Sequence, residues 1–107
     1  MYGWTLLFIA IIFEALGTTS MKLSDGFSNL IPSILIFVFY GLSFALFPFS
    51  LKTIDVSTAY AVWAGLGTVI ITFIGIFYFS EPATILKMIS ITAIVAGVVG
   101  LRLAGVE

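Results

Sequence analysis

A single acid lies inside an apolar stretch near the start of the chain, FIAIIFEALGTTSMK. This residue, Glu14, follows Trp4 by ten positions. A helix rising about 1.5 Å per residue would place it near the middle of a hydrocarbon layer roughly 30 Å thick. An ionised group at that depth costs about 2.5–3.5 kcal/mol on insertion scales. No Lys or Arg occurs at comparable depth in an apolar segment, so a structural ion pair lacks its base. Glu14 is therefore predicted to bind protons or cations that come and go, with a neutral structural acid as the alternative.

The helix face that carries Glu14 is lined by small residues. Ala10, Gly17 and Thr18 lie three or four positions from the acid, so they share its face. Small side chains leave room for a ligand beside the carboxylate, but they also let a neighbouring helix pack closely. The sequence leaves both interpretations open for Gly17 and Thr18.

A later apolar segment, STAYAVWAGLGT, supplies aromatic rings. Tyr60 and Trp63 are three positions apart and share a helix face with Gly67. Aromatic faces attract cations, most strongly where water is excluded, so a carboxylate with these rings suits an organic cation. The alternative for Tyr60 is an interfacial aromatic belt, whereas Trp63 lies deeper. Gly65 and Gly67 frame a position where the helix can bend.

Two other apolar segments contribute candidates. Tyr40 and Ser43 are three positions apart; Tyr40 can hydrogen-bond an acid or line a cavity, and Ser43 can do so or bond its own backbone. Near the C-terminus, Ala93, Gly97 and Gly100 belong to small-xxx-small spacings that allow close helix contact and suit a dimer.

Composition indicates the elements that must position these residues. Of 107 residues, 62% are hydrophobic and 8% charged, and there is no Cys or His. Soluble domains carry about a quarter charged residues, so the chain is predicted to be an all-α membrane protein. The sequence offers no metal cluster, cofactor motif or nucleophile–base set, and its net charge of −1 argues against a nucleic-acid partner. The expected single transmembrane domain has four spans, at about 4–21, 31–51, 57–79 and 84–103.

The basic residues give no preferred orientation. With four spans, Lys52 and Arg102 fall on one side of the bilayer, and Lys22 and Lys87 fall on the other. This balance predicts dual topology, in which copies insert both ways and pair antiparallel. The alternative is a weak orientation signal that a helper protein reads or that a partner chain fixes.

These motifs together resemble the small multidrug resistance family of proton-coupled exporters, over essentially the whole chain. The matching features are Glu14 followed by ALGTTSMK, SDGF at 24–27, Pro32, AYAVWAGLGT at 59–68 and, more weakly, AGVVG at 96–100. The combination is more specific than any one of its parts.

The resemblance implies an antiparallel homodimer in a bacterial inner membrane, in which two Glu14 residues share one site for protons or small organic cations. In the family pattern, Tyr60 and Trp63 are binding-site aromatics, and Tyr40 and Ser43 are second-helix site positions. The remaining correspondences are Gly65 and Gly67 in the third-helix kink, and Gly97 and Val98 in the fourth-helix dimer contact.

The branch of the family is indicated by Gly17. Guanidinium exporters tend to carry Trp there, so glycine favours export of quaternary ammonium and aromatic cations. Asp55 departs from a frequent proline, and the passage KTIDVSTAY is similar to members encoded as gene pairs. A guanidinium exporter, one subunit of a heterodimer and a non-transporting membrane subunit remain the alternatives.

Overall fold

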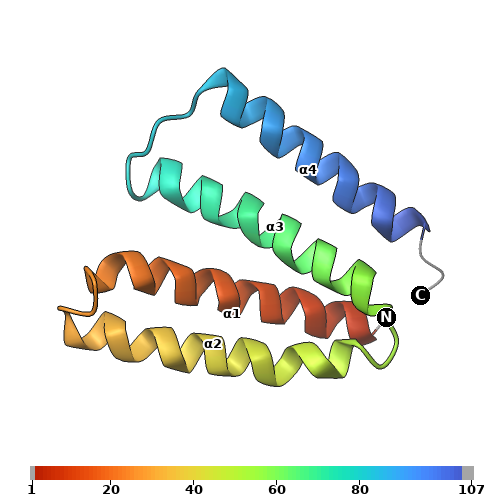
Figure 1. The fold of residues 1–107 in the computed structure, drawn as a ribbon, viewed down its shortest axis with the longest axis horizontal. Coiled ribbons are helices and arrows are strands. Elements are labelled where there is room, and N and C mark those ends of the chain that lie inside the picture. Colours follow the sequence, from red (N-terminus) through yellow and green to blue (C-terminus); the bar gives the residue numbers. More distant parts are fainter. Residues whose placement is uncertain (1, 105–107) are drawn as a thin grey trace.

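The computed structural model describes residues 2–104 and forms four helices there, with no strand in that range. The helices are α1 (Tyr2–Ser24), α2 (Leu30–Ser50), α3 (Val56–Phe77) and α4 (Ile85–Ala104) (Figure 1). All four are long and apolar enough to cross a membrane, which confirms the prediction of an all-α protein with four transmembrane helices. The largest difference from the predicted spans is at the end of α1. The prediction ended this span at Met21, whereas the helix continues through Lys22 and Leu23 to Ser24.

The connection between α1 and α2 is a tight turn. Asp25, Gly26 and Phe27 all have positive φ, at 51°, 66° and 68°. Glycine adopts this backbone region without steric cost, and Asp tolerates it better than most residues. The Asn29 side chain donates to the carbonyl oxygen of Leu23 across the turn, at 3.0 Å. The turn therefore reverses the chain so that α2 runs back along α1.

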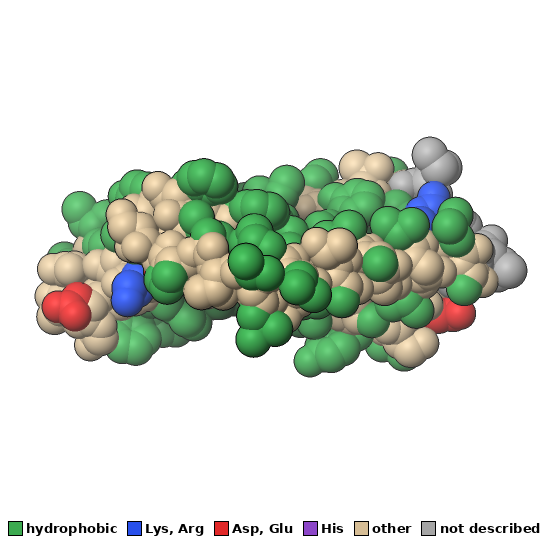
Figure 2. Space-filling model, turned by 90° about the horizontal axis from the view of Figure 1, so that it is seen from above, with side chains coloured by type: hydrophobic (Ala, Val, Ile, Leu, Met, Phe, Trp, Pro, Cys, Tyr) green, Lys and Arg blue, Asp and Glu red, His purple; other side chains and the backbone are tan. Residues whose placement is uncertain are grey.

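The helices lie side by side in the order α2, α1, α3, α4, in a shallow layer measuring 44 × 35 × 16 Å (Figure 1). The start of α1, the end of α4 and the α2–α3 connection are at one end, and the other two connections are at the opposite end. On the face seen in Figure 2, charged side chains appear only near the two ends, and hydrophobic side chains cover the middle. This distribution is that of a protein with its middle in lipid.

Small residues bring α1 and α2 together. Ala10, Ala15 and Gly17 are buried on α1, and these two helices contact each other more extensively than any other pair. The hydroxyl of Ser43, which is fully buried, donates to the backbone carbonyl of Ala10 at 2.7 Å. The two helices are therefore joined by a hydrogen bond as well as by close packing.

Helix α4 is attached mainly through α3. A Cβ on Gly65 would lie 2.9 Å from Cγ2 of Val98 and 3.3 Å from Cγ2 of Ile94, so glycine permits this close approach. Ile91 is the one buried residue within Ile85–Ala104. The four predicted dimer contacts differ in position: Ala93, Gly97 and Gly100 are exposed, whereas Val98 packs inward against Gly65.

Candidate cation-binding pocket

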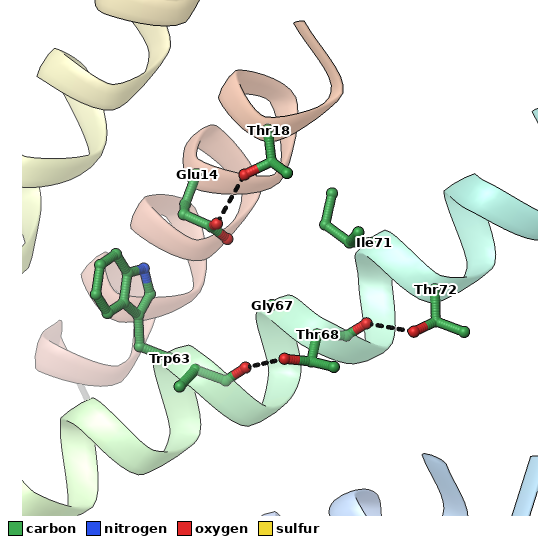
Figure 3. A pocket seen from close by; sticks show the side chains of 8 residues that line it. Glu14, Thr18, Trp63, Gly67, Thr68, Ile71 and Thr72 are labelled. Atoms are coloured by element: carbon green, nitrogen blue, oxygen red, sulfur yellow. Dashed lines mark hydrogen bonds between the residues drawn. The ribbon is translucent and has the colours of Figure 1, made fainter. Parts of the chain in front are cut away.

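The side chain of Glu14 lines a pocket between α1 and α3. The pocket has a volume of about 400 Å³. Figure 3 shows Glu14 projecting from α1 toward α3, where Gly67 and Trp63 lie across from it. The lining residues, which include no Lys or Arg, are Glu14, Thr18, Trp63, Ala64, Gly67, Thr68, Ile71 and Thr72. Among residues 2–104, the one charged group that lines this pocket is therefore an acid, which lies between two membrane-spanning helices.

Gly67 makes room for that acid. A Cβ at this position would lie 2.8 Å from Oε1 of Glu14, closer than a side-chain carbon normally approaches an oxygen. The absence of a side chain therefore lets the carboxylate lie directly against the backbone of α3. The sequence predicted a bend at Gly67; in the structure this glycine makes the close contact with Glu14.

We expect Gly67→Ala to turn the carboxylate away from α3, since that group is the end of a flexible side chain, and to weaken cation binding by about fivefold, as roughly 1 kcal/mol is lost with a displaced charge contact. Titration of purified protein with tetraphenylphosphonium would measure the change. Gly41→Ala is the matched control, because a Cβ there would meet nothing within 4 Å and Gly41 is not a predicted dimer contact. Equal affinity in both variants would contradict the role assigned to Gly67.

Two hydroxyls connect Glu14 to α2. The Thr18 hydroxyl donates to Oε2 of Glu14 at 2.9 Å, and the Tyr40 hydroxyl lies 2.5 Å from the Thr18 oxygen. A threonine hydroxyl has one proton, which Thr18 gives to the carboxylate, so the Tyr40 hydroxyl must donate to Thr18. The resulting chain of hydrogen bonds runs from Tyr40 through Thr18 to Glu14 and connects the acid on α1 to α2.

Removal of the middle hydroxyl, in Thr18→Val, should lower the affinity for tetraphenylphosphonium about tenfold, because hydrogen bonds to charged groups contribute about 1.5–3 kcal/mol. The variant keeps the shape of the side chain. Thr19→Val is the control, since the Thr19 hydroxyl donates instead to the backbone carbonyl of Ala15 at 2.8 Å. Equal losses in the two variants would mean that the effect is on helix stability.

Trp63 is held by rings from α2. Its ring stacks on Phe47 with centroids 5.0 Å apart and meets the edge of Phe44 at 5.7 Å. Its indole nitrogen is buried and has no hydrogen-bond partner in residues 2–104, so it is an unused donor on a residue that lines the pocket. The sequence reasoning missed Phe44 and Phe47, although they follow Tyr40 at helical spacing and the signal was therefore present.

The other predicted site residues are distributed around this pocket. Tyr60 is 59% exposed and reaches the pocket only through the Trp63 ring, 5.9 Å away. Ser43 and Ala10 do not line the pocket, because their mutual hydrogen bond lies in the α1–α2 contact. Sequence reasoning also missed Thr68, Ile71 and Thr72, which continue the pocket along α3. They follow Ala64 by four, seven and eight positions, so they share its helix face.

Gly17 sets the position of Tyr40. It is buried on α1, and a Cβ there would lie 3.2–3.3 Å from three carbons of the Tyr40 ring. The ring therefore rests directly on the helix backbone, which brings its hydroxyl to Thr18. A small residue at position 17 is thus linked through contacts to the environment of Glu14.

Comparison with known proteins identifies the family. Residues 2–94 match the family described as Small Multidrug Resistance protein. The chain is 54% identical to the uncharacterized membrane protein YvaE of Bacillus subtilis, with 94% of this chain and 85% of the relative covered. It is 42% identical to the quaternary ammonium compound-resistance protein QacE of Escherichia coli (96% and 94% covered). Identity to a guanidinium exporter of Yersinia pestis is 39% (95% and 98% covered).

Family members are transporters, and the four apolar helices with these bacterial relatives indicate a multi-pass protein of the inner membrane. The chain belongs to the small multidrug resistance family.

Proposed function

We propose that this protein is a proton-coupled antiporter that exports hydrophobic organic cations, chiefly quaternary ammonium and aromatic cations. The observation that carries the proposal is the Glu14 carboxylate in an otherwise uncharged membrane pocket beside the Trp63 ring. A carboxylate neutralises a cation, and an indole face holds its apolar body. The name of the relative QacE, a quaternary ammonium compound-resistance protein, is in keeping with this substrate class.

The exchange takes place at one group. Protonated Glu14 releases its proton when a cation binds, and the cation leaves when a proton returns, so the pocket holds either one positive charge or the other. Lipid makes an ionised carboxylate without a partner costly, which disfavours the empty, ionised state. Coupling of the two gradients follows from this competition and needs no separate proton path.

The site is completed by a second copy in an antiparallel homodimer. The pocket opens on one face of the single-layer chain, and an inverted copy facing it would bring a second Glu14 to the same chamber. Helix α4 offers the exposed small residues Ala93, Gly97 and Gly100 to such a partner. Bending of α3 near Gly65 and Gly67 would change the separation between α3 and the carboxylate as access alternates.

The contact between Gly17 and Tyr40 favours bulky cations over guanidinium. Tyr40 packs against the helix because no side chain lies at position 17. Its ring also stacks on Phe44, with centroids 6.0 Å apart, and so extends the aromatic surface around Trp63. An extended apolar surface of this kind suits a cation with a bulky apolar body better than guanidinium, whose N–H groups all need hydrogen-bond acceptors. The name of the guanidinium-exporting relative keeps that substrate as the second candidate.

Currents from proteoliposomes containing this chain alone would test the proposal. We expect tetraphenylphosphonium and tetraalkylammonium to drive larger proton-coupled currents than guanidinium. The reverse order would identify a guanidinium exporter. Currents that appear only after a second, related chain is added would identify a heterodimer subunit, and no current under either condition would support a non-transporting role.

A further inference from the structure

A second cavity lies on the opposite side of α3 from Glu14. The first pocket takes Ala64 and Thr68 from α3, whereas the second takes Val62 and Leu66, about half a helical turn away. The second cavity is a groove of about 310 Å³ between α1, α3 and α4. If two copies share Glu14 across the first face, this groove is turned toward the lipid.

The walls of the groove are apolar and one end carries a charge. The lining residues are Trp4, Phe8, Val62, Leu66, Val69, Val95, Val98, Val99, Arg102 and Leu103. Among residues 2–104, Arg102 is the only charged residue in this lining, and it lies in the last turn of α4, where a basic side chain reaches the membrane interface. From Val95 to Arg102 the helix rises about 10 Å, so the groove extends from the interface well into the hydrocarbon layer.

Arg102 is held in a defined place. Its guanidinium lies 4.6 Å from the centroid of the Trp4 ring. An arginine stacked on an aromatic face keeps the N–H groups at its edges free, and these form paired hydrogen bonds with phosphate oxygens. Trp4 is itself 5% exposed and belongs to the core, so the ring beneath the guanidinium is a fixed support.

We infer that this groove binds an anionic phospholipid, with its phosphate group on Arg102 and one acyl chain along the apolar walls. The charge and the shape of the groove match the two parts of such a lipid. Basic pockets between transmembrane helices are a recognised kind of site for anionic head groups. The site is distinct from the exchange pocket, and lipid binding can be measured without any transport.

Native mass spectrometry of the purified protein tests the inference, with phosphatidylglycerol and phosphatidylcholine of identical acyl chains as probes. We expect the first phosphatidylglycerol per chain to bind about fivefold more tightly than phosphatidylcholine, and Arg102→Gln to remove that preference. Lys52→Gln is the matched control, because Lys52 lies at the same end of the molecule but outside the groove, over the Phe49 ring. It should retain the preference.

A second variant tests the acyl-chain part of the site. Val95 lines the groove and is 41% exposed, so Val95→Phe should fill it without disturbing the core and should weaken binding of both lipids. Leu86→Phe, at an exposed position outside the groove, is its control. Equal binding of the two lipids by the unmodified protein, or equal losses in Arg102→Gln and Lys52→Gln, would overturn the inference. Unchanged lipid binding in Val95→Phe would also overturn it, even if that variant changed the number of chains in the assembly.

Discussion

Glu14→Gln should abolish proton-driven export while leaving the protein folded in the membrane. The amide keeps the size of the side chain and can still accept the hydrogen bond from Thr18, but it can neither release a proton nor neutralise a cation. Removing one partner of a buried charge pair costs about 2–5 kcal/mol, so cation affinity should fall by at least about thirtyfold. Accumulation of tetraphenylphosphonium in liposomes under an imposed pH gradient measures the effect.

Glu81→Gln is the matched control for that experiment. Glu81 lies in the α3–α4 connection, where its backbone N–H donates to the carbonyl oxygen of Gly75 at 2.9 Å, and it does not line the exchange pocket. The same chemical change there should leave accumulation close to that of the unmodified protein. Gradient-driven accumulation by Glu14→Gln would contradict the proposed mechanism, as would equal losses in the two variants.

Gly17→Trp should shift selectivity away from bulky aromatic cations. Because even a Cβ at position 17 would press on the Tyr40 ring, an indole there must displace that ring and break its hydrogen bond to Thr18. Overpacking of this kind costs about 1–3 kcal/mol, so the ratio of tetraphenylphosphonium current to guanidinium current should fall by about tenfold.

The control for position 17 is Gly41→Trp. Gly41 is an exposed glycine of α2 with nothing within 4 Å of its Cβ position, so a side chain added there begins in open space and does not press on Tyr40 as one at position 17 does. Its current ratio should match that of the unmodified protein. If Gly17→Trp also kept the original ratio, Tyr40 would not determine which cations the site accepts.

The fold and the position of the acid could be predicted from sequence because lipid leaves few alternatives. Four apolar segments of membrane-spanning length must form helices, since no other isolated segment satisfies its backbone groups in hydrocarbon. The depth of Glu14 then follows from counting residues along one helix. These conclusions require no knowledge of how the helices pack.

The contacts between helices could not be predicted in the same way. Spacing along one helix shows which residues share a face, but not which neighbour that face meets. Ser43 has the spacing of a site residue, yet it is buried against the backbone of Ala10. Val98 lies beside exposed glycines in sequence, yet it packs inward on Gly65. The hydrogen bond between Thr18 and Tyr40 depends on how α1 meets α2, which the sequence alone does not specify.

The central claim is that a proton and a cation compete for Glu14, and proton release on cation binding tests it most directly. Purified protein in weakly buffered detergent solution would be mixed with tetraphenylphosphonium while a pH indicator reports free protons. The account predicts that the unmodified protein releases protons as it binds the cation and that Glu14→Gln releases none. Saturating cation binding by the unmodified protein without proton release, at any pH from mildly acidic to mildly basic, would contradict it.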